Sequence, residues 1–195
     1  ERYAITREAQ DRYASESYRR AVASVESGRF KDEIVPVEVP QRKGGFLVFD
    51  TDECPRETPY EAMAKMKPAF KKDGFGTAGN ASIISDGAAA TVLMSREKAE
   101  ALGCEVLATV GAQASFGMDM KYVLVAPIWA IPKVLAKEGI GIQDVDLFEV
   151  NEAFSGSTLA VMQELSLDPQ KTNVNGGSVS IGHPIGASGC RVLVT

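Results

Sequence analysis

Residues 173–189 read Asn-Val-Asn-Gly-Gly-Ser-Val-Ser-Ile-Gly-His-Pro-Ile-Gly-Ala-Ser-Gly, and no other stretch of the chain carries so dense a signal. Five glycines within fourteen residues suit neither a plain strand nor a plain helix, because glycine loses the most backbone entropy on folding. The single histidine, His183, precedes Pro184, which favours the first turn of a helix. The pattern predicts a strand-to-helix turn at the edge where open α/β sheets bind ligands.

A second polar cluster, Asn151-Glu152-Ala153-Phe154, follows another apolar segment in the same way. It places an amide and a carboxylate at the same predicted sheet edge, so we expect Asn151 and His183 to share one pocket. Two plainer interpretations stay open at this point. Asn151 can cap a helix, a position that asparagine favours, and His183 can bond a carbonyl within a tight turn.

Outward from these clusters, strand-like and helical patterns alternate. Strands are predicted at residues 106–113, 145–150 and 172–180. Helices are predicted at about 128–137, with an interruption at Pro132, at 153–165 and after Pro184. A further strand is predicted at 86–94, before a helix at 96–102 that Ser95 caps and Gly103 ends. This alternation predicts an α/β fold with a covered, mostly buried sheet.

The first 80 residues have a different pattern. Thr6 can cap a helix whose apolar positions recur at helical spacing as far as Val25, with Gly28 as its stop. Beyond Gly28 the sequence predicts two strands of a hairpin, an acidic loop and a helix, at residues 34–39, 45–49, 50–59 and about 60–70.

The composition excludes several classes of protein. The 195 residues are 45% hydrophobic with a net charge of −5, and the basic residues form no long cluster, so we expect no nucleic-acid partner. No apolar stretch reaches the roughly 18 residues of a membrane span, and residues 1–4 lack a signal-peptide pattern. We therefore expect a cytoplasmic protein without a membrane partner. The chain starts without methionine and ends in an uncapped helical run, which indicates an excerpt of a longer protein.

Other motif-based functions find no support. The three cysteines, Cys54, Cys104 and Cys190, are odd in number and form neither a Cys-x-x-Cys pair nor a secreted disulfide framework. One histidine, with no metal-ligand spacing among the cysteines, predicts no metal site. The glycine run is not Gly-x-Gly-x-x-Gly, and the chain has no phosphate-binding P-loop. Ser188 stands in Gly-Ala-Ser-Gly, which lacks the Gly-x-Ser-x-Gly of a hydrolase nucleophile.

Taken in order, these stretches resemble the thiolase family, and acetyl-CoA acetyltransferases in particular. The resemblance rests on residues 151–154 and 173–189, and on Ala-Gly-Asn-Ala-Ser at 78–82 with Asp-Gly-Ala-Ala-Ala at 86–90. Residues 28–36 and 67–70 match as well, so it covers essentially the whole chain.

The resemblance implies an incomplete thiolase-like α/β fold, part of a layered αβαβα architecture plus an inserted loop domain that holds coenzyme A. Residues 1–80 would be a partial loop domain, 81–104 the last part of the N-terminal domain, and 105–195 the first part of the C-terminal domain. It also implies a homodimer or homotetramer that takes acyl-CoA. Coenzyme A and acetyl-CoA would enter as substrates, with no tightly bound cofactor.

The reaction implied by the resemblance is the reversible Claisen condensation of two acetyl-CoA molecules through an acyl-cysteine intermediate. His183 would activate the nucleophilic cysteine and polarise the acyl oxygen, while Asn151 would hold a water that completes the oxyanion site. The contacts to coenzyme A would come from Arg56 near its nucleotide end and from Ser82, Ala153 and Phe154 along its pantetheine.

The family's two catalytic cysteine motifs are missing from the chain. None of its three cysteines matches those positions, so we expect them to be inert and the chain alone to be inactive. A longer-chain 3-ketoacyl-CoA thiolase and a non-catalytic thiolase-like protein that binds acyl-CoA or acts as a scaffold remain as alternatives.

Overall fold

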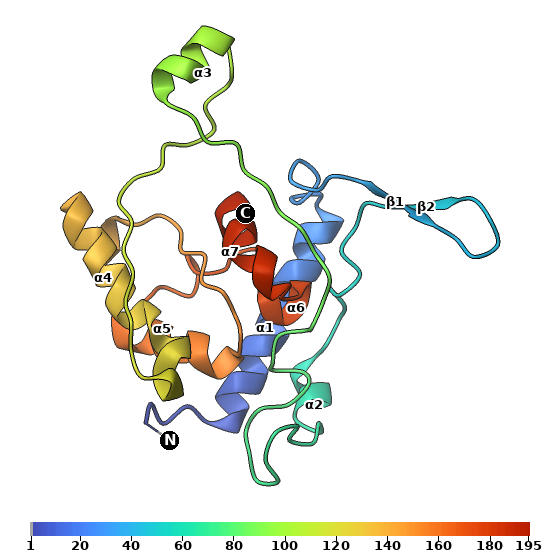
Figure 1. Ribbon diagram of the computed structural model, residues 1–195. Helices are drawn as coiled ribbons and strands as arrows, with labels where there is room; N and C mark the ends of the chain where they lie inside the picture. The colour runs from blue at the N-terminus through green and yellow to red at the C-terminus, as the bar shows by residue number, and fades with distance from the viewer. Residues whose placement is uncertain (1) are drawn as a thin grey trace.

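The structure is a computed structural model that describes residues 2–195, and most of its regular secondary structure is helical. In chain order its elements are α1 (Arg7–Glu26), β1 (Val37–Pro40), β2 (Phe46–Phe49), α2 (Tyr60–Met63), α3 (Arg96–Leu102), η1 (Met120–Val125), α4 (Pro127–Glu138), η2 (Ile142–Asp144), α5 (Ser155–Leu165), α6 (Ser178–Ile181) and α7 (Ile185–Val194). Figure 1 shows α1 passing through the middle of the molecule, with α6 and α7 beside it and α4 and α5 to one side.

The long helix α1 begins and ends where its sequence predicts. The Thr6 side chain accepts a hydrogen bond from the Ala9 amide, which satisfies one of the free donors of the first turn. Beyond the helix, Gly28 adopts a positive φ of 74°, a conformation that favours glycine. The predicted helix and both of its end signals are confirmed.

Two apolar clusters hold the helices together. The first joins α1, α2 and α6 through Ala14, Tyr18, Met63 and Val179. The second joins η1, α4 and α5 through Val125, Ile128, Val150, Ala160, Val161, Met162 and Leu167. Removing these side chains from water supplies the main favourable free energy of the fold.

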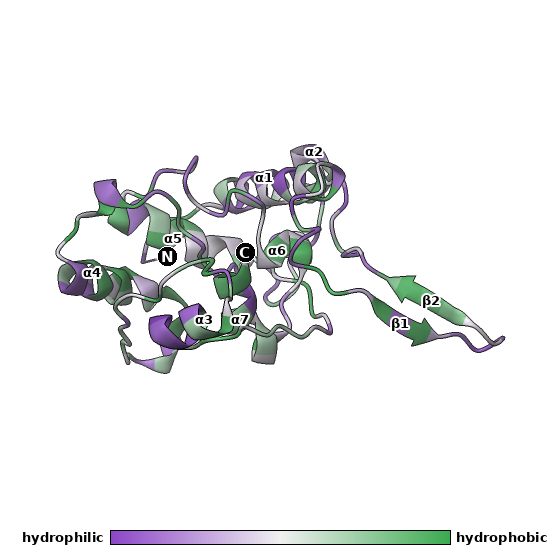
Figure 2. Ribbon diagram, turned by 90° about the horizontal axis from the view of Figure 1, so that it is seen from above, coloured by the Kyte–Doolittle hydropathy of each residue, from purple (hydrophilic) through white to green (hydrophobic). Residues whose placement is uncertain are grey.

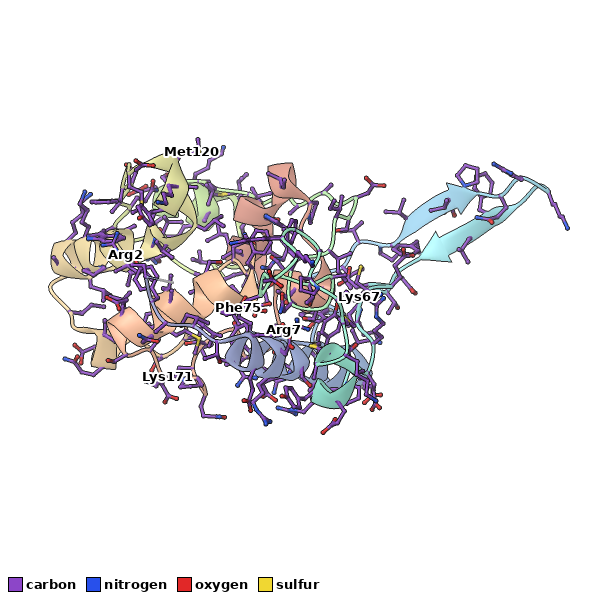
Figure 3. All side chains as sticks on the ribbon, turned by 90° about the horizontal axis from the view of Figure 1, so that it is seen from below. Arg2, Arg7, Lys67, Phe75, Met120 and Lys171 are labelled. Atoms are coloured by element: carbon purple, nitrogen blue, oxygen red, sulfur yellow. The ribbon has the colours of Figure 1, made fainter. Side chains whose placement is uncertain are left out.

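The predicted hairpin is confirmed, with strands β1 and β2 paired antiparallel and Val37 opposite Phe49. Every residue of both strands is exposed. Figure 2 shows the hairpin projecting from the rest of the molecule, with hydrophobic residues on both strands.

The helix predicted at 96–102 is also confirmed, because Ser95 caps α3 and Gly103 ends it at a φ of 64°.

The four strands predicted at residues 86–94, 106–113, 145–150 and 172–180 are wrong as secondary structure. In the described parts of these segments, Phe148 and Thr172 form one isolated parallel bridge, and Val174 and Gly176 form another. A parallel sheet needs neighbours that pair with each strand's backbone groups. Apart from these bridges the described residues of the four segments lack such neighbours, and Val92 and Leu107 are 84% and 90% exposed.

Three helices also differ from the prediction. Residues 178–181 form α6, because the Ile181 amide donates to the Gly177 carbonyl at 2.8 Å. Helix α2 ends at Met63, well short of residue 70, and Pro68 forms a bridge with Thr77. Helix α4 continues through Pro132, where an interruption is predicted.

The exposed apolar segments predict weak stability for the 195-residue chain on its own. We expect it to bind the dye 8-anilinonaphthalene-1-sulfonate and to unfold gradually in urea, because large apolar side chains on residues 84–94 and 106–110 face water. Fluorescence and circular dichroism measured across a urea titration test this. A single cooperative transition with a slope of about 2 kcal/mol/M or more would contradict it.

Candidate functional site

His183 lies between α6 and α7, where one hydrogen bond holds its backbone and another holds its ring. Its amide donates to the Ile83 carbonyl at 2.9 Å, and its Nδ1 lies 2.6 Å from Ser188 Oγ. Because the Ser188 hydroxyl donates to the Pro184 carbonyl at 3.0 Å, its oxygen is left to accept a proton from Nδ1. This network favours the tautomer in which Nε2 carries the free lone pair, as a general base requires.

The environment of His183 keeps the imidazole neutral. Partial burial lowers its pKa below the ordinary histidine value, and the positive charge of Arg191 on α7 lowers it further. Arg191 itself forms an ion pair with Glu149 at 2.8 Å. A neutral imidazole can take a proton from a thiol, so the geometry and the charge are both those of a base.

Asn151 lies at the other end of α6. Its Oδ1 accepts a hydrogen bond from Ser178 Oγ at 2.5 Å, and Ser178 is the first residue of that helix. Asn151 does not cap α5, because the N-cap position belongs to Phe154. The structure therefore places Asn151 and His183 at opposite ends of one helix of about 6 Å length.

Asn151 and His183 are also predicted to share one pocket. A cleft of about 460 Å³ lies beside Pro184, between residues 85–89 and 184–187. A second cavity of about 310 Å³ lies between α1 and α5. Neither of these two is lined by Asn151 or His183, and the structural link between the two residues that the described contacts give is α6.

Three of the four residues predicted to contact coenzyme A meet in space. The Ser82 amide donates to the Ala153 carbonyl at 3.2 Å, and Ala81 forms an antiparallel bridge with Phe154. Arg56 is exposed, with its guanidinium carbon 5.8 Å from the centroid of the Tyr18 ring. The structure thus brings Ser82, Ala153 and Phe154 together, while the described contact of Arg56 is with Tyr18.

Two residues have positions that sequence patterns did not reveal. Glu152 is completely buried and accepts hydrogen bonds from four donors, although it is not itself a predicted site residue. Cys54, in the predicted acidic loop, is partly buried, and a Cβ added to Gly182 would lie 3.7 Å from its sulfur. Burial raises the pKa of Cys54, with Glu53 adding to the effect, which disfavours the reactive thiolate.

Within residues 2–195, no cluster of histidine, cysteine and carboxylate side chains is arranged to hold a metal ion. None of the helices described there is long and apolar enough to cross a membrane.

Comparison with known proteins connects this geometry to a family. Residues 1–97 match the model of the thiolase N-terminal domain, and residues 104–195 match that of the thiolase C-terminal domain. An acetyl-CoA acetyltransferase of Pseudomonas aeruginosa is 55% identical over 100% of this chain and 50% of its own length.

Solved structures agree with the matches to the two thiolase domain models. The crystal structure of the Bacillus anthracis acetyl-CoA acetyltransferase superposes with a TM-score of 0.96 at 47% identity, over 99% of this chain and 49% of that one. Human mitochondrial 3-ketoacyl-CoA thiolase gives a TM-score of 0.90 at 38% identity, over 99% and 48%. The chain spans about half the length of these relatives, and the predicted partial thiolase-like fold is confirmed. From the two domain matches and these similarities, we conclude that the chain belongs to the thiolase family.

Proposed function

We propose that this protein catalyses the reversible condensation of two acetyl-CoA molecules to acetoacetyl-CoA and coenzyme A. In the first half-reaction a cysteine thiolate attacks the acetyl thioester, forms an acyl-cysteine and releases coenzyme A. In the second, a base that lies outside this chain in our proposal takes a proton from another acetyl-CoA, and the resulting enolate attacks the acyl-cysteine and frees the thiolate. The acyl-accepting cysteine lies outside this chain in our proposal.

The observation that carries this proposal is the placement of Asn151 and His183 at the two ends of α6. His183, with its free Nε2 and lowered pKa, takes the thiol proton and donates to the developing oxyanion. Asn151 holds the water that completes the oxyanion site. The acetyl-CoA acetyltransferases among the relatives support the acetyl group as the unit transferred.

The binding of coenzyme A is assigned to the segments that meet beside α5. Ser82, Ala153 and Phe154 form a short extended ladder, which presents backbone groups to the pantetheine amides. Arg56 is exposed and free to reach the nucleotide phosphates, which lie at the far end of the same ligand. We propose that the active protein is a homodimer or homotetramer of the cytoplasm.

The proposal is tested by assaying the protein expressed from its whole gene. We expect thiolysis of acetoacetyl-CoA by coenzyme A, followed by loss of acetoacetyl-CoA absorbance, and no turnover by the 195-residue chain alone. No turnover by the whole-gene product, together with retained binding of acyl-CoA, would favour a non-catalytic binding protein and refute the proposal.

A longer-chain 3-ketoacyl-CoA thiolase is the second candidate, because the human mitochondrial 3-ketoacyl-CoA thiolase superposes over nearly the whole chain. The two candidates differ in the substrate that turns over fastest. Comparing kcat/KM for acetoacetyl-CoA with that for 3-ketoacyl-CoA of longer chain separates them, and a clear preference for the longer chains would replace the first candidate.

Ser188→Ala provides a test of how His183 is oriented. The variant removes the acceptor of the Nδ1 proton, so we expect kcat for thiolysis to fall about five- to tenfold, the equivalent of one hydrogen bond, with little change in KM. Ser27→Ala is the matched control, because the Ser27 hydroxyl bonds only its own helix turn. An unchanged kcat in Ser188→Ala would show that the ring does not need this partner.

A further inference from the structure

Glu152 is a buried carboxylate that hydrogen bonds surround on both oxygens. Its Oε1 accepts from the Tyr13 hydroxyl at 2.7 Å and from Asn173 Nδ2 at 3.0 Å. Its Oε2 accepts from Ser17 Oγ at 2.8 Å and from the Val179 amide at 3.2 Å. Four donors match the four lone-pair sites of an ionised carboxylate, so the charge is compensated by hydrogen bonds alone.

The state of Tyr13 agrees with this description. Burial, reinforced by the negative charge of Glu152, raises the pKa of the Tyr13 hydroxyl well above its ordinary value. Tyr13 therefore stays protonated and donates to the carboxylate at every physiological pH.

The donors to Glu152 come from segments that meet around α6. Tyr13 and Ser17 lie on α1, Asn173 lies before α6, and Val179 lies within it. Ser17 Oγ also lies 2.9 Å from Ser180 Oγ and accepts from the Gly177 amide at 3.2 Å. Glu152 and Ser17 together thus fasten the first turn of α6 to α1.

The glycine before α6 is required by this arrangement. A Cβ on Gly177 would lie 2.6 Å from Glu152 Oε2, so the carboxylate occupies the space of a side chain. Burying a charge without a cation is costly, and an apolar side chain of similar volume is often more stabilising. Stability alone is therefore a weak reason for a carboxylate at this position.

We infer that Glu152 is a positioning residue that holds α6 in place and, through its last turn, fixes the backbone of His183. The connection is short, because Gly182 alone separates the end of α6 from His183. The His183 amide is held on its other side by the Ile83 carbonyl. Loss of the carboxylate would release one of these two anchors. The catalytic consequence of this inference rests on the proposed function, and its structural consequence does not.

The structural consequence can be measured in the protein expressed from its whole gene. Glu152→Gln is expected to raise amide hydrogen exchange of the peptide spanning residues 176–183 about tenfold or more. The carboxamide places an NH2 donor against groups that are themselves donors, so at least one hydrogen bond to this side chain is lost. The same variant should raise the rate at which diethyl pyrocarbonate modifies His183, located by peptide mass. Glu152→Asp should restore part of the protection, and Glu164→Gln, an exposed carboxylate on α5, should change neither. A folded Glu152→Gln protein with unchanged exchange and unchanged modification overturns the inference.

A second pair of variants keeps the test decisive if Glu152→Gln does not fold. Ser17→Ala and Tyr13→Phe each remove one hydroxyl donor to Glu152, but only Ser17 also contacts α6. We expect Ser17→Ala to raise exchange in residues 176–183 about fivefold, and Tyr13→Phe to change it less than about twofold. Equal effects of the two variants would show that Glu152 serves the core as a whole, and would overturn the positioning role.

The kinetic readout separates this inference from the proposed function. In an active thiolase, Glu152→Gln should lower kcat about tenfold with KM within about twofold of the wild type, because substrate contacts are untouched. Equal losses in kcat and in substrate affinity would count against positioning. A wild-type protein without thiolase activity would refute the proposed function, while the exchange and modification results would still decide the role of Glu152.

Discussion

Replacing His183 with alanine is expected to lower thiolysis by the protein expressed from its whole gene about a thousandfold. The variant removes both the base that takes the thiol proton and one donor to the oxyanion. Initial rates with acetoacetyl-CoA and coenzyme A measure the loss. Turnover within about tenfold of the wild type would refute the assigned role.

Cys190→Ala is the matched control for this experiment. Cys190 lies on α7, lines the cleft beside Pro184 and has its sulfur 3.9 Å from Thr91 Oγ1. We expect the variant to keep nearly full activity, because the thiol contacts neither His183 nor Asn151 in the described hydrogen bonds. A large loss would instead make Cys190 part of the chemistry.

The pH dependence of the rate has a definite sign. Because burial and Arg191 lower the pKa of His183, the neutral imidazole persists below the ordinary histidine value of about 6.5. The rate should therefore begin to fall only below that value. The same shift makes the unfolded state bind the proton first, so this group's contribution to stability is present at neutral pH. It is lost as pH falls from the unfolded pKa through the folded one.

Local signals explain what the sequence predicts well. Helix α1 and helix α3 each have a hydroxyl cap and a glycine stop within a few residues of their ends, and those signals act without the rest of the fold. The hairpin pairs neighbouring segments for the same reason. The segments at 86–94 and 106–113 have apolar strand patterns, but a strand exists only when another backbone pairs with it. Pairing is a property of the tertiary structure.

The candidate site also contains residues that the sequence predicts and residues whose roles it does not predict. Asn151 and His183 follow from motif and position, and the structure links both to α6. The role of Glu152 depends on donors from residues 13, 17, 173 and 179, which no sequence spacing connects. Cys54 lies beside Gly182 through a contact between residues 128 positions apart. Neither relation leaves a local pattern.

Three of the five glycines in residues 173–189 are required by the protein's own packing: Gly176, Gly177 and Gly182. Gly176 has a positive φ of 82°, and a Cβ there would lie 2.7 Å from the Ser17 carbonyl oxygen. Gly182 has a φ of 116°, and the Ser85 side chain occupies the space that a Cβ would take. Gly189 has no atom within 4 Å of its Cβ position and lies inside α7. A dense glycine motif therefore contains positions with opposite requirements.

Gly176→Ala and Gly189→Ala are expected to change stability in opposite directions. At Gly176 the new methyl group would meet the backbone of α1, and the positive φ adds strain, so we expect a loss of about 3–5 kcal/mol in the free energy of unfolding. At Gly189 the same substitution places a better helix former in open space, with a gain of up to about 1 kcal/mol. Melting temperatures of both variants of the protein expressed from its whole gene test this. Equal melting temperatures would mean that α1 can move away from Gly176 at little cost. Because α1 also carries Ser17 and Tyr13, such mobility would weaken the case for a rigid α6 as well.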